Sequence, residues 1–205
     1  LALPPGWTEQ QPERDAVNNP GYFPNASLTE KTLRVAMAGY YATISQIDHH
    51  VGRMLDLLEK RNLLENTVVI FTADHGEYLG FHHMLLKGGY LYDALTRVPL
   101  IIRWPGGRSG GTVDERLASC LDLAPTILGQ AGIRPPETMT GMDLAGSEPG
   151  PELVYAERLA GKRPDGSPGC QVMVRSKTRK LIRTEPREGS LFFDLESDPL
   201  EMTNL

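Results

Sequence analysis

The sequence predicts an α/β fold in which a parallel sheet with flanking helices is followed by a small antiparallel subdomain. Over residues 28–61, apolar side chains recur at alternating steps of three and four, which indicates one long amphipathic helix with a single buried stripe. Ser27 and Glu30 match a capping box at the start of this helix. Two short apolar runs, at residues 67–72 and 97–104, are typical of strands that a parallel sheet buries on both faces.

The composition is that of an ordinary globular protein. The 205 residues are 40% apolar and 23% charged, which suffices for a packed core and argues against wholesale disorder. A net charge of −5 with scattered Lys and Arg argues against nucleic acid as a partner. No apolar run approaches membrane-spanning length, so we expect no membrane partner. Cys120 and Cys170 lack metal-like spacing, and a single disulfide between them stays open.

Three segments follow from the distribution of these patterns. Residues 1–26 are rich in Pro and Asn and are expected to be irregular. Residues 27–150 form the main α/β domain, which includes a second helix predicted over residues 117–131 and ended by Gly132. Residues 151–205 form the antiparallel subdomain, whose short strands are predicted at residues 153–157, 171–175, 179–183 and 190–194.

A carboxylate, an imidazole and a glycine directly follow the first predicted strand. These residues are Asp74, His75 and Gly76. Ligands of open α/β sheets bind at the carboxyl ends of strands, where an Asp oxygen and a His nitrogen can hold a divalent cation. Gly76 permits the sharp turn that brings both side chains together. The same pair also fits a plain strand-ending cap and turn, so the spacing by itself leaves both interpretations open.

Several further motifs follow in a fixed order along the chain. They are Tyr41-x5-Ile47-Asp48-x2-Val51-Gly52 on the long helix, Leu79-Gly80-Phe81-His82, the Gly-flanked Lys87, Val98-Pro99-Leu100-Ile101, and Leu195-Glu-Ser-Asp-Pro199-Leu-Glu201-x2-Asn204-Leu205. Together with Asp74-His75-Gly76, this series resembles the type I sulfatase family of the alkaline phosphatase superfamily. The resemblance covers the chain from Ser27 onward, and it implies the carboxyl-terminal half of an alkaline-phosphatase-like catalytic domain, with residues 27–150 in that domain.

The resemblance also assigns roles to four residues. Asp74 and His75 match the second pair of metal ligands, so a divalent cation is expected, with calcium as the family default and manganese or zinc favoured by the softer His nitrogen. Lys87 matches the catalytic lysine that binds an oxygen of the transferred sulfuryl group. His82 matches a histidine that could act as an acid toward the leaving-group oxygen. Without the motif, Lys87 would be an ordinary surface lysine.

The chain also departs from the family pattern. The family nucleophile is a formylglycine made from Cys or Ser in a Cys/Ser-x-Pro/Ala-x-Arg motif, and neither Cys120 nor Cys170 stands in that context. The amino-terminal Asp-Asp ligand pair is absent too, so we expect the formylglycine in a missing amino-terminal half and this chain alone to be inactive. Phe81 and His83 stand where Asp and Gly are frequent, and the His82-His83 pair resembles the phosphonate monoester hydrolase branch.

The sequence therefore predicts a parent enzyme that hydrolyses a small-molecule sulfate ester with the help of a metal ion. One alternative is a phosphonate monoester or phosphodiester hydrolase on the same scaffold. Another is a catalytically inactive fragment or binding module. Glu77 is left between two roles, indirect support of the metal ligands or a helix-start charge. The oligomeric state is left open.

Overall fold

The computed structural model describes residues 1–10, 27–87, 90–162, 168–185 and 189–205. The chain divides into two compact units, Leu1–Thr112 and Val113–Leu205, and each is described by itself. Most of the segment predicted to be irregular, residues 11–26, lies outside the described residues, and residues 1–10 contain only turns and one isolated β-bridge. The predicted boundary at residue 150 falls inside the second unit.

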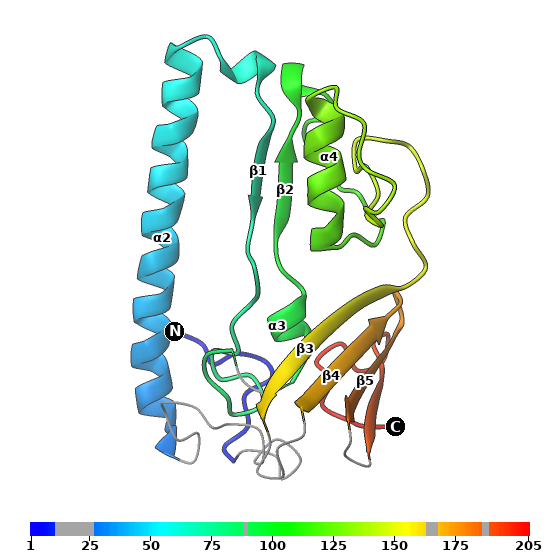
Figure 1. Ribbon diagram of the computed structural model, residues 1–205. Helices are drawn as coiled ribbons and strands as arrows, with labels where there is room; N and C mark the ends of the chain where they lie inside the picture. The colour runs from blue at the N-terminus through cyan, green and yellow to red at the C-terminus, as the bar shows by residue number, and fades with distance from the viewer. Residues whose placement is uncertain (11–26, 88–89, 163–167, 186–188) are drawn as a thin grey trace. The chain divides into compact units, whose positions relative to one another are not determined.

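A single long helix, α2, runs from Glu30 to Lys60 in the first unit (Figure 1). Its N-cap is Thr29, whose hydroxyl accepts a hydrogen bond from the Thr32 N–H at 3.2 Å, while the Thr32 hydroxyl accepts one from the Thr29 N–H at 2.9 Å. The capping box predicted at Ser27 and Glu30 is therefore wrong, because the helix begins two residues later and a threonine pair caps the amides of Thr29 and Thr32. Glu30 instead forms an ion pair with Arg34 one turn later.

The buried stripe predicted along α2 is confirmed only for its first turns. Leu33 and Met37 are 0% and 2% exposed, and they form a core cluster with Leu28. Further along the stripe, Val51 and Leu58 are half-buried, and four apolar residues are 40% to 58% exposed: Tyr40, Ile44, Ile47 and Met54. Periodicity thus identifies the apolar face of the helix, whereas burial depends on what lies opposite that face. No helix in the described part of the chain combines the length and apolar character that a membrane crossing needs.

Two short strands, β1 (Val69–Thr72) and β2 (Leu100–Arg103), pair with each other in the first unit (Figure 1). They are antiparallel, with Val69 opposite Arg103 and Thr72 opposite Leu100. The parallel arrangement predicted for them is therefore wrong, because parallel neighbours need a crossover helix and the connecting residues contain only the four-residue helix α3 (Asp93–Thr96). Burial on both faces is wrong as well, since Ile101 is 64% exposed. The 3-10 helices η2 (Leu64–Asn66) and η3 (Pro105–Gly107) flank the pair.

The helix predicted over residues 117–131 is confirmed in shortened form. The 3-10 helix η4 (Cys120–Asp122) leads into α4 (Leu123–Gln130). Ser119 delays the start, because its extended backbone and its capping box with Asp122 place the first turn after it. Gly132 follows the helix with a φ of +70°, the left-handed conformation expected of a helix-ending glycine.

The antiparallel subdomain is confirmed as a four-stranded sheet. Its order is β3-β4-β5-β6, and every neighbouring pair is antiparallel. Figure 1 shows β3, β4 and β5 side by side in the yellow-to-red part of the chain. The strands are β3 (Val154–Lys162), β4 (Pro168–Arg175), β5 (Arg179–Glu185) and β6 (Ser190–Asp194). The α/β class predicted from sequence is confirmed for this chain.

The closing segment, residues 195–205, folds back onto this sheet. Glu201 reaches the buried Lys180 of β5, and the Asn204 side-chain oxygen accepts a hydrogen bond from the Phe192 N–H at 2.8 Å. On the buried face of the sheet, Met173 and Phe193 are 3% and 0% exposed. The motif that carries part of the family resemblance is thus built into the packing of the second unit.

Candidate functional site

Asp74 and His75 lie just beyond the end of β1 and share one small volume. The Asp74 carboxylate accepts a hydrogen bond from the His75 backbone N–H at 2.9 Å, and its other oxygen lies 3.7 Å from His75 Nε2. The Asp74 side chain is 89% exposed and the His75 side chain is 39% exposed. An oxygen and a nitrogen donor are therefore close enough to face the same cation.

The orientation of the His75 ring is fixed by the backbone. Its Nδ1 lies 2.8 Å from the Gly76 carbonyl oxygen. A carbonyl oxygen can only accept, so Nδ1 carries the hydrogen, and Nε2 lies on the side of Asp74, where it can donate a lone pair to a metal ion. Histidine ligands of metals are commonly oriented in this way by a backbone carbonyl. The donor set therefore fits a divalent cation.

Gly76 makes the turn after the pair possible through close packing. Its N–H donates to the Leu95 carbonyl at 2.7 Å, and a Cβ at this position would lie 2.0 Å from the Ala94 carbonyl oxygen. No side chain fits in that space. The described residues contain no cluster of three or more His, Cys, Asp or Glu that could hold a metal. Asp74 and His75 are two donors, fewer than a divalent cation takes, and their role as metal ligands stays a prediction.

The loop that follows, residues 78–87, is held in an unusual backbone conformation. Four of its non-glycine residues have positive φ angles between 44° and 62°: Leu79, His82, His83 and Leu86. Each such residue costs about 1–3 kcal/mol, and this conformation persists only where the surroundings enforce it. The concentration of four in one short loop indicates a segment whose shape is imposed by its contacts.

His82 is enclosed in an aromatic stack. Its residue exposure is 0%, and its ring lies 4.5 Å from the Phe81 ring and 4.3 Å from the Tyr92 ring, nearly parallel to both. Its backbone N–H donates to the Gly6 carbonyl at 2.8 Å. The Tyr78 hydroxyl donates to the Tyr90 carbonyl beneath the same loop. The predicted acid role of His82 stays a prediction, and its ring is inside the aromatic cluster in this chain.

His83 attaches the amino-terminal segment to the loop. Its Nδ1 lies 2.7 Å from the Thr8 carbonyl oxygen, and its ring stacks on Trp7 with centroids 4.7 Å apart. Trp7 also forms an isolated β-bridge with Phe81. The residues that depart from the family pattern therefore bind residues 6–8. This contact is not predicted from the sequence, where the signal for it is a lone Trp in a Pro-rich segment.

Lys87 is exposed, and the residue immediately before it, Leu86, is held by a hydrogen bond to Glu77. The Leu86 N–H donates to Glu77 Oε1, and the same oxygen accepts from the Leu79 N–H at 3.1 Å. Glu77 therefore joins the two ends of the loop. It does not stand at the start of a helix, so the helix-start role is wrong, and indirect support of the metal ligands stays a prediction. That Lys87 and the Asp74–His75 pair contact one anion stays a prediction.

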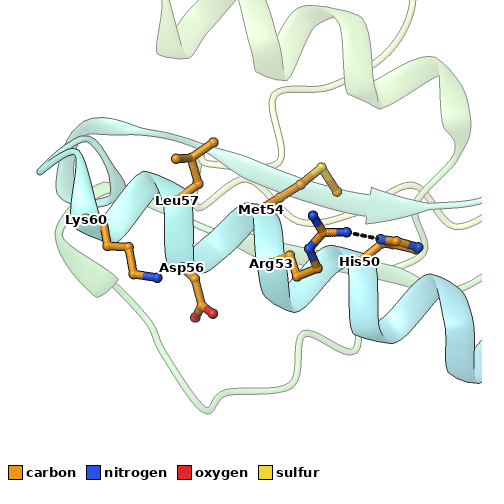
Figure 2. Close-up of a pocket in the computed structure, with 6 residues that line it drawn as sticks. All are labelled: His50, Arg53, Met54, Asp56, Leu57 and Lys60. Atoms are coloured by element: carbon orange, nitrogen blue, oxygen red, sulfur yellow. Dashed lines mark hydrogen bonds between the residues drawn. The ribbon is translucent and has the colours of Figure 1, made fainter.

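A separate hollow lies along the exposed part of α2 (Figure 2). It is lined by His50, Arg53, Met54, Asp56, Leu57 and Lys60, with Arg53 Nη1 3.1 Å from His50 Nδ1. All six side chains come from one helix. None of the predicted site residues lines this hollow, so it is distinct from the candidate site.

The sequence profile of the sulfatase family matches residues 4–133. An arylsulfatase from Clostridium perfringens is 34% identical to the chain over 182 residues, an alignment that covers 87% of this chain and 37% of the arylsulfatase. The chain thus spans less than half the length of this relative.

Solved structures also match the chain, and they belong to sulfatase-like enzymes. A structure from Bacteroides thetaiotaomicron described as a sulfatase matches with a TM-score of 0.79 and 29% identity, covering 89% of this chain and 40% of that one. A phosphonate monoester hydrolase from Silicibacter pomeroyi matches with a TM-score of 0.75 and 26% identity, covering 87% and 38%. The chain belongs to the sulfatase family, within the alkaline phosphatase superfamily.

Proposed function

We propose that the full-length protein containing this chain hydrolyses small-molecule sulfate esters with the help of a divalent cation. The observation that carries this proposal is the Asp74–His75 pair, whose oxygen and Nε2 donors lie 3.7 Å apart at the end of β1 in a chain of the sulfatase family. Sulfatases usually need a divalent metal, and these two side chains offer the donor types that such an ion takes.

Each site residue has one task in this proposal. Asp74 and His75 would hold the cation, and the Gly76 carbonyl keeps the His75 ring oriented. Lys87 binds a non-bridging oxygen of the ester through its ammonium group. His82 donates a hydrogen bond to the leaving-group oxygen, which requires a path to its buried ring. When bound, the cation would lower the cost of negative charge at the reacting group.

The identity of the cation and of the nucleophile are finer parts of the same proposal. We assign calcium first, with manganese and zinc next because one donor is a His nitrogen. Neither Cys120 nor Cys170 stands in the family's nucleophile motif, so the proposal places the formylglycine in sequence outside this chain. Residues 27–150 then contribute to the catalytic domain, and residues 151–205 form its appended subdomain.

A second candidate function is phosphonate monoester or phosphate diester hydrolysis. Two observations favour it: the similarity to the phosphonate monoester hydrolase structure and the His82-His83 pair. These esters carry a single negative charge, as a sulfate ester does, so the charge of the site does not separate them. The identity to that structure is 26%, below the 34% found with the arylsulfatase, which keeps sulfate as the first choice.

Steady-state kinetics of the full-length protein would test both candidates. We expect the highest kcat/KM for an aryl sulfate, compared with a phenylphosphonate monoester and a phosphate diester. Lys87→Ala should lower turnover of all three by about 10²- to 10³-fold, because it removes a charged contact to an oxygen that they share. A kcat/KM for either phosphorus ester well above that for the sulfate would reject sulfate as the main substrate.

A further inference from the structure

We propose that Glu77 is the positioning residue that sets the direction of Lys87 relative to the Asp74–His75 pair. The inference rests on the proposed function in so far as that function gives Lys87 its role. Glu77 stands between the two groups in the chain, two residues after His75 and ten before Lys87. It does not itself need to contact the substrate.

A single oxygen atom of Glu77 binds both ends of the loop. Its Oε1 accepts hydrogen bonds from the N–H groups of Leu79, at 3.1 Å, and Leu86. The Tyr78 N–H adds a weaker bond to the Leu86 carbonyl at 3.3 Å. One carboxylate oxygen therefore ties the first residues of the loop to the residue immediately before Lys87.

The two N–H groups that donate hydrogen bonds to Glu77 belong to residues with a strained backbone conformation. Leu79 has a φ of +44° and Leu86 a φ of +62°, a region that leucine rarely enters. Hydrogen bonds to a charged acceptor contribute about 1.5–3 kcal/mol each, which is comparable to the cost of holding one residue in this conformation. Glu77 is thus the group whose loss would release Leu86 toward an ordinary backbone conformation.

The rest of the site is anchored independently of Glu77. The Gly76 N–H is held by the Leu95 carbonyl at 2.7 Å, and the middle of the loop is held by the His82 N–H bond to Gly6 at 2.8 Å. Removing the carboxylate should therefore act locally, on Leu86 and Lys87. A displacement of about 1 Å at a catalytic group can cost about 10²-fold in rate.

Two substitutions in the full-length protein separate positioning from general stability. Glu77→Gln keeps a side-chain oxygen that can accept hydrogen bonds from both backbone N–H groups, whereas Glu77→Ala removes that oxygen. Glu137→Ala is the matched control, because that glutamate side chain is 93% exposed and lies in the second unit. The measurements are aryl sulfate turnover, the Kd for inorganic sulfate, and hydrogen exchange of the peptide that contains residues 78–87.

We expect Glu77→Ala to lower kcat by about 10²-fold and to deprotect the Leu79 and Leu86 amides, with Glu77→Gln within about fivefold of the unmodified protein. In a Lys87→Ala background, Glu77→Ala should cost less than about threefold, because its effect runs through the missing lysine. Sulfate affinity should fall with Glu77→Ala and not with Glu137→Ala.

Either of two kinetic results would overturn the inference. One is full additivity of Glu77→Ala and Lys87→Ala, and the other is a Glu77→Gln variant as impaired as Glu77→Ala. If the unmodified protein hydrolyses no sulfate ester, the proposed function fails, and the inference is then decided by the sulfate Kd and by hydrogen exchange. Unchanged exchange and unchanged sulfate affinity in Glu77→Ala would reject it on those grounds alone.

Discussion

Lys180 Nζ lies 2.7 Å from Glu201 Oε1, and both side chains are completely buried. Lys180 belongs to β5, and Glu201 belongs to the closing segment and has a φ of +57°. A buried charge is tolerated only with a well-placed partner, because taking either ion out of water is costly. This pair therefore fastens the end of the chain to the four-stranded sheet.

Breaking the pair from one side should destabilise the protein strongly. We expect Lys180→Met or Glu201→Leu to lower the free energy of unfolding by about 3–5 kcal/mol, because each leaves an uncompensated buried charge. The double substitution should recover most of that loss, since it removes both charges. Urea unfolding of the three variants measures this, and a double variant no more stable than either single one would contradict it.

The pH dependence of stability has a contribution from Asp114. Hydrogen bonds from the Arg116 side chain, and then from its backbone, hold the pKa of Asp114 below its usual value of 3.8. The carboxylate thus stabilises the fold above pH 3.8, and this contribution is lost as the pH falls through the lower folded-state pKa.

Asp114→Asn should therefore lower stability at pH 7 by no more than about 1 kcal/mol, because the Asp114 side chain is 57% exposed and solvent screens the pair. The difference between Asp114→Asn and the unmodified protein should shrink below pH 3.8. Urea unfolding at pH 7 and at pH 3 is the measurement. A difference that grows on acidification would show that the carboxylate is not the cause.

The preference of the protein for one metal ion over another should depend on the ring nitrogen of His75. In the full-length protein, Asp74→Ala should abolish metal-dependent turnover, because it removes the anionic donor. His75→Asn should retain activity with calcium better than with manganese or zinc, since it exchanges a nitrogen donor for an oxygen. Turnover after chelation and re-addition of each ion measures this. Equal losses with all three ions would speak against His75 as a ligand.

The 205-residue chain by itself should be inactive and prone to self-association. It contains only two of the proposed metal ligands and no formylglycine motif, and the α2 residues Ile44 and Ile47 are 44% and 47% exposed. Replacing both isoleucines with Lys should reduce association in sedimentation experiments, with Thr43→Lys on the same helix as the control for added charge. Sulfatase activity that persists in the highly purified chain would refute the first half of this expectation.

The sequence predicts where helices and strands lie better than it predicts how the strands pair. The helix α2 and the four strands of the second unit follow from periodicity, which is set within a few residues. The direction of β1 relative to β2 does not, because apolar runs of this kind look the same in parallel and antiparallel sheets. The N-cap at Thr29 also escapes prediction, since Ser27 offers the same hydroxyl chemistry two residues earlier.

For the candidate site, the sequence identifies the side chains that could bind a metal, and the structure identifies the contacts that hold the surrounding loop. Asp74 and His75 are adjacent in the chain, so their proximity could be predicted from the motif. The contacts of Glu77 and His83 could not, because they join residues nine and seventy-five positions apart. Such contacts depend on how a loop closes, and no local pattern encodes that closure.

The packing of the closing segment changes what its motif can be used for. Glu201 and Asn204 bind Lys180 and the backbone of β6, so these contacts hold the closing segment to the sheet. This motif therefore marks the architecture of the second unit, and it carries no information on the choice between sulfur and phosphorus esters.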